Sequence, residues 1–145
     1  MKQTFISILT VLVLAVATYA AQKGDGHEAE FRTFYADFLK AVQANDKERI
    51  ADLIAFPVGD FDWYVRKGDR DDAVSIKDKA EFLRKYDTFF TDDTRRHVLK
   101  AKTIALEGGR YAASWDEDET EFTFLFEYIE GSGYRVESFT IGARD

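Results

Sequence analysis

The sequence predicts an α+β domain in which N-terminal helices pack on a curved antiparallel sheet. Between residues 29 and 100, apolar side chains mostly recur at steps of three and four residues, which is the spacing of one helix face. From Ala101 onward the spacing changes to two, which is typical of strands with one buried face. Helical segments that precede a meander of strands favour helices packed against one face of a sheet.

Residues 1–20 have the pattern of a cleaved signal peptide. A positive start at Lys2 is followed by an apolar run over residues 5–17 and by small residues before Ala20. The alternative is a membrane anchor, but this run is shorter than the about 20 apolar residues that span a bilayer. We therefore expect export to the periplasm or the extracellular space, with cleavage after Ala20 and no stable membrane anchor.

Residues 21–28 are expected to form a flexible arm, and residues 29–145 a single domain. The first helix is predicted by an apolar face made of Phe31, Phe34, Tyr35, Phe38, Ala41 and Val42. Asn45, followed by Glu48, is predicted to cap a second helix. That helix must end by Phe56, because Pro57 disfavours helical backbone in the residue before it.

A short hairpin and further helices are expected next. Alternation over residues 61–65 predicts a half-buried strand, residues 67–72 a charged turn, and residues 73–76 a short partner strand. Asp78 with Glu81 predicts the start of another helix, and Thr91 can cap a short helical turn after it.

Four strands are predicted in the last third of the chain, at residues 101–106, 110–115, 121–130 and 134–141. Glycines at 108, 109, 131 and 133 and the acidic run 116–121 separate them. One face of the third of these strands is a row of aromatic side chains: Phe122, Phe124, Phe126 and Tyr128.

Composition excludes several classes of site. The chain has no cysteine, which removes disulfides, thiolate nucleophiles, Cys-ligated zinc and lipid attachment after a signal peptide. Its two histidines, His27 and His97, are far apart in the sequence, so we expect no metal site, and no motif indicates a cofactor. A formal net charge of −7 disfavours nucleic acid as a partner.

The order of elements resembles the nuclear transport factor 2-like superfamily, also called the cystatin-like cone. Residues 34–42, 50–57 and 76–86 resemble small exported bacterial members of it. The resemblance implies three helices and a strongly curved sheet around a conical pocket, and related families often form homodimers through the outer sheet face. It does not imply one activity, because the same fold carries enzymes, carriers and scaffolds.

The resemblance also supplies weak catalytic candidates. Ketosteroid-isomerase-like members place a general-base carboxylate where Asp60 and Asp62 stand, and a donor tyrosine where Tyr35 stands. Such a pair would remove a proton next to a carbonyl and stabilise the oxyanion. Strand alternation, however, places both aspartates opposite Phe61, Trp63 and Val65, where they would face solvent.

Charged clusters have simpler explanations than ligand binding. The acidic run 116–121 lacks the glycine and glutamate spacing of an EF-hand, so a solvated turn is expected. An anion site is one interpretation of the basic cluster at residues 95–102, but charge matching at a helix C-terminus explains it more simply. His97 is expected to lie at the surface or to cap the helix.

Aromatic residues with a polar atom are the candidate ligand-binding set: Tyr35, Trp63, Tyr86, Trp115 and Tyr128. The same residues could simply fill the core. Three functions therefore stay open at this point. They are an exported, non-enzymatic binding or scaffold domain for a small apolar ligand or a protein, a small lyase or isomerase, and an acidic inhibitor or interaction module for a basic protein.

Overall fold

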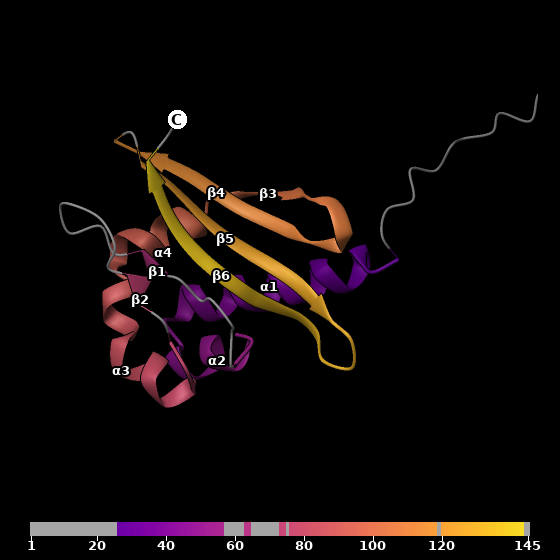
Figure 1. Ribbon diagram of the computed structural model, residues 1–145, viewed down its shortest axis with the longest axis horizontal. Coiled ribbons are helices and arrows are strands. Elements are labelled where there is room, and N and C mark those ends of the chain that lie inside the picture. The colour runs from indigo at the N-terminus through magenta and orange to yellow at the C-terminus, as the bar shows by residue number, and fades with distance from the viewer. Residues whose placement is uncertain (1–25, 57–62, 65–72, 75, 119, 144–145) are drawn as a thin grey trace, which may run out of the picture.

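The chain has an α+β fold in which the helices precede the main sheet, as the sequence predicts (Figure 1). The computed structural model describes residues 26–56, 63–64, 73–74, 76–118 and 120–143. The predicted signal peptide and most of the arm lie outside this range. The helices are α1 (Glu28–Ala44), α2 (Lys47–Asp52), α3 (Lys79–Phe89) and α4 (Asp92–Val98), and a 3₁₀ turn, η1, covers Glu107–Gly109.

Six strands form two separate antiparallel sheets. β1 (Trp63–Tyr64) pairs with β2 (Ala73–Val74), which confirms the predicted hairpin. The main sheet has the order β3-β4-β5-β6, made of Lys102–Ala105, Tyr111–Glu117, Thr120–Ile129 and Gly133–Ala143. These are the four predicted strands with shifted ends. Glu137 is an extra residue in β6, because Leu125 faces Ser138 and Phe126 faces Val136, and such bulges bend a strand.

Local capping fixes where the helices begin. The carboxylate of Asp78 accepts a hydrogen bond from the Glu81 amide at 2.8 Å, and the Thr91 hydroxyl accepts one from the Thr94 amide at 3.1 Å, as predicted. The predicted cap of the second helix was wrong by one residue. Asp46 accepts from the Arg49 amide at 3.0 Å, whereas Asn45 has φ 53° and ends α1. Asparagine tolerates this left-handed conformation, which lets α1 turn directly into α2.

The main sheet buries its inner face against the helices. Phe124 and Phe126 are fully buried and Phe139 is 1% exposed, and the rings of Phe124 and Phe139 stack with centroids 4.3 Å apart. Phe38 of α1 meets Phe124 and Phe126 edge-on at 5.7 and 5.6 Å. The aromatic row predicted on the third strand of the meander therefore forms the centre of the core.

Candidate functional site

Of the three catalytic candidates, only Tyr35 lies within the described residues. Asp60 and Asp62 lie outside the described residues, and of Trp63 the structure describes only the backbone of β1. Tyr35 lies on α1, half-buried against Phe31 and Phe126, with ring centroids 5.6 and 5.5 Å away. Its hydroxyl oxygen is buried and has no hydrogen-bond partner among the described residues, and this burial raises the pKa of Tyr35.

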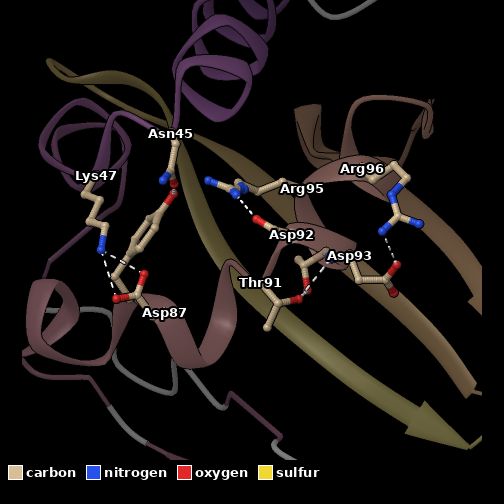
Figure 2. A network of polar contacts seen from close by, with 10 residues as sticks. Asn45, Lys47, Asp87, Thr91, Asp92, Asp93, Arg95 and Arg96 are labelled. Atoms are coloured by element: carbon tan, nitrogen blue, oxygen red, sulfur yellow. Dashed lines mark hydrogen bonds and ion pairs between the residues drawn. The ribbon is translucent and has the colours of Figure 1, made fainter.

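Tyr86 is a fully buried part of the packing between α3 and the α1–α2 junction. Its hydroxyl donates a hydrogen bond of 2.9 Å to Oδ1 of Asn45, whose position Figure 2 shows. Its ring stacks on Phe90, with centroids 5.0 Å apart. Lys47 Nζ lies 4.9 Å from the ring centroid and also pairs with Asp87 at 2.8 Å. Burial raises the pKa of Tyr86 to about 12. These contacts connect three helices through one side chain.

Trp115 and Tyr128 lie far apart on the sheet. Trp115 stacks on Phe122 at 5.3 Å and on His97 at 5.8 Å, whereas Tyr128 stacks on His27 at 3.8 Å. Phe122 and Tyr128 are six residues apart on β5, which corresponds to about 20 Å along a strand. The four described candidates thus lie at different places around one aromatic core and do not line a common pocket among the described residues. Ligand binding by them stays a prediction.

An open surface groove of about 510 Å³ runs between α1, the end of α2 and the start of β6. Its apolar floor is formed by Phe34, Leu53 and Tyr134, of which the last two are nearly buried. The full lining consists of Ala29, Glu30, Thr33, Phe34, Asp37, Arg49, Leu53, Gly133, Tyr134 and Arg135. The groove therefore offers exposed apolar surface next to charged side chains of both signs.

Ion pairs and backbone bonds hold the sides of this groove in place. Arg49 of α2 pairs with Asp37 of α1, and this hydrogen bond raises the pKa of the Arg49 guanidinium above its usual value. The guanidinium of Arg135 donates to the Tyr134 carbonyl at 2.7 Å. On the floor of the groove, the Tyr134 hydroxyl donates a hydrogen bond of 2.9 Å to the Gly109 carbonyl, and this bond fixes the position of the Tyr134 ring.

Sequence reasoning missed this groove because its residues come from three separate segments. The periodic pattern assigned Phe34 to the apolar face of the first helix and gave no sign of a groove beside it. Only the return of the chain at Asn45 brings Arg49 to Asp37, and only the β5–β6 turn brings Tyr134 to α1. Tyr128, a predicted ligand-binding residue, reaches the groove through Tyr134, since the centroids of the two rings lie 5.4 Å apart.

No protein-family model, no curated protein and no solved structure matches this chain. The resemblance to the nuclear transport factor 2-like superfamily therefore stays a prediction. Within the described ranges, no helix is long and apolar enough to cross a bilayer.

Proposed function

We propose that this chain is an exported, non-enzymatic binding domain of the nuclear transport factor 2-like kind that holds a segment of another protein in the groove between α1 and β6. Export rests on the leader-like pattern of residues 1–20, and mass spectrometry of the exported protein should then find a chain that begins at Ala21.

One observation carries the choice of a surface site: the inner face of the sheet is occupied by packed aromatic rings. Phe124 and Phe126 are fully buried between β4, β6 and α1, where an open cone would leave such rings accessible to a ligand. The groove lies at the edge of that core, where Phe34 is partly exposed above the buried Leu53 and Tyr134. Exposed apolar surface with a charged rim is typical of protein-binding sites.

The shape and charge of the groove favour a peptide over a small molecule. Pockets for small apolar ligands enclose most of the ligand, and this groove is too open to do so. Glu30 of α1 and Arg135 of β6 carry opposite charges in its lining, whereas Asp37 and Arg49 already pair with each other. The partner segment should therefore place an apolar side chain on Phe34 and carry charges of both signs beside it.

Site-specific photocrosslinking in the producing cells tests this proposal. A photoreactive amino acid at Thr33, an exposed groove position, should give one discrete crosslinked protein, and Phe34→Glu should abolish the crosslink. The matched control places the same amino acid at Thr94 on α4, outside the groove, and should not give that product. Equal crosslinking from both positions, or a product unaffected by Phe34→Glu, would contradict groove binding.

The lyase or isomerase function remains the second candidate, because the buried Tyr35 hydroxyl is unpartnered among the described residues. A donor held in that state is what stabilisation of an oxyanion requires. Tyr35→Phe separates the two functions. In an enzyme it should lower kcat for proton abstraction while the protein stays folded, and in a binding domain it should leave partner crosslinking at Thr33 unchanged. The third candidate, an acidic interaction module, requires binding that weakens steeply with salt.

A further inference from the structure

Three ligand-type side chains meet at the end of the molecule opposite the groove. Asp93 and His97 lie four residues apart on α4, so they share one helix face, and Glu117 lies at the end of β4. His97 Nε2 is 3.6 Å from Oδ2 of Asp93 and 3.6 Å from Oε2 of Glu117. One donor atom from each side chain lies within 4.8 Å of the other two.

These distances do not describe hydrogen bonds. A separation of 3.6 Å is too long for a direct bond between an imidazole nitrogen and a carboxylate oxygen. It is close to the spacing between ligands of one cation, since ligands about 2.1 Å from a zinc ion at tetrahedral angles lie about 3.4 Å apart. The three groups therefore face one another across a gap of the size that a divalent metal ion fills.

The surrounding residues orient each of the three groups. The His97 ring is stacked parallel to Trp115, with an interplanar angle of 4°. Arg96 pairs with Oδ1 of Asp93 at 3.1 Å, and this leaves Oδ2 to face His97 (Figure 2 shows the Arg96 pair). Partners that orient a ligand in this way are a regular feature of metal sites. Glu117 is placed by its pairing with Thr120 across the β4–β5 turn.

We propose that Asp93, His97 and Glu117 bind one divalent transition-metal ion, with Zn²⁺ as the best match. One imidazole nitrogen and two carboxylate oxygens suit zinc and its neighbours better than Ca²⁺, which prefers oxygen ligands alone. All three groups are partly accessible, so an ion can enter and can keep water in its remaining positions. The ion would clamp α4 to β4.

Calorimetric titration of the purified, untagged and chelator-treated protein with Zn²⁺ tests the site. Wild type should bind one ion, and His97→Ala should weaken binding by at least about tenfold, because loss of a ligand should cost no less than loss of a residue that orients one. His27→Ala is the matched control. His27 also lies beside a carboxylate, 3.2 Å from Glu30, but among the described residues it does not belong to a cluster with a second carboxylate. This variant should bind as wild type does.

A second pair of variants distinguishes coordination by a particular carboxylate from general attraction of Zn²⁺ to negative surface charge. Glu117→Gln should weaken Zn²⁺ binding at least about tenfold, whereas Asp92→Asn, on the same helix turn as Asp93 but paired with Arg95, should not. Titration with Co²⁺ should also give a visible absorption band that is absent in His97→Ala. No saturable 1:1 binding by wild type, or equal losses in Asp92→Asn and Glu117→Gln, would overturn the proposal.

Discussion

The two faces of the main sheet differ sharply although they alternate along the same strands. On the inner face, Phe124 and Phe126 are fully buried and ring contacts connect them to α1. On the outer face, Ser114 and Thr123 are paired through their hydroxyls at 2.9 Å, and Ile104 of the edge strand β3 is 57% exposed. One face thus has the packing of a core, and the other has the small and polar side chains of a surface.

This difference indicates where the domain can bind a partner without losing its fold. Among the described residues, the inner rings pack against one another, so a ligand between them would have to displace a ring, and that displacement costs several kcal/mol for a buried aromatic side chain. Sites at the margins of the sheet add partly buried side chains, such as Phe34 and His97, to the edge of the core. The groove beside Phe34 and the cluster around His97 both lie at the margin of the main sheet.

The largest effect is expected from truncating an inner-face ring. Phe124→Ala should lower the free energy of unfolding by about 3–5 kcal/mol, because it removes buried surface and leaves a cavity among rings. Ile104→Ala on the outer face is the control and should change it by about 0.5 kcal/mol or less. Urea denaturation measures both. Similar losses in the two variants would remove the distinction between the faces.

A smaller effect should distinguish two tyrosine hydroxyls on the helical side. Tyr86→Phe removes a donor from Oδ1 of Asn45 and should cost about 1 kcal/mol. Tyr35→Phe removes a buried hydroxyl with no described partner, so stability should stay the same or rise. The two replacements are chemically identical, and their difference in melting temperature reports the polar contacts of the Tyr86 hydroxyl, with Asn45 and with Arg95. Equal losses would mean that the Tyr35 hydroxyl has a partner.

The smallest effect concerns Glu137 at the β6 bulge. Burial, followed by repulsion from Glu127, raises the pKa of its carboxyl, and one oxygen is buried without a described partner. The folded state therefore favours the protonated form. Its contribution to stability is present below the unfolded pKa, near 4.5, and is lost as the pH rises through the folded value.

Glu137→Gln keeps the shape of that side chain and removes the charge. At pH 7 it should be more stable than wild type, by less than about 1 kcal/mol because the group is partly exposed and solvent screens it. The difference should disappear as the pH falls below 4. Denaturation at pH 7 and pH 3.5 tests this, and a destabilised variant at pH 7 would contradict it.

Sequence patterns predicted the core well because burial imposes a strict period. The two-residue spacing of Phe122, Phe124 and Phe126 identified the inner face of β5, and the caps Asp78 and Thr91 located two helix starts. The second helix began one residue later than predicted. Asn45 and Asp46 are both good caps, and only the reversal of the chain after α1 assigns the left-handed conformation to Asn45.

The groove and the cluster around His97 could not be predicted from the sequence, because their residues come from segments that meet only in the folded chain. Asp93 and His97 were visible as neighbours on one helix face, but charge matching at the helix ends already explained them. Glu117 was visible only as part of an acidic turn. Packing of α4 on β4 brings the three together, and no local pattern encodes that contact.

The most direct test of a packed inner face is a fluorescence screen with apolar ligands. Steroids, fatty acids and aromatic acids should cause no saturable change in tryptophan emission and no rise in melting temperature, because rings already fill the space behind β5. Trp115→Phe identifies the responding indole if a change occurs. Saturable 1:1 quenching by one such ligand, lost in Trp115→Phe and accompanied by a higher melting temperature, would show an open pocket and contradict the account.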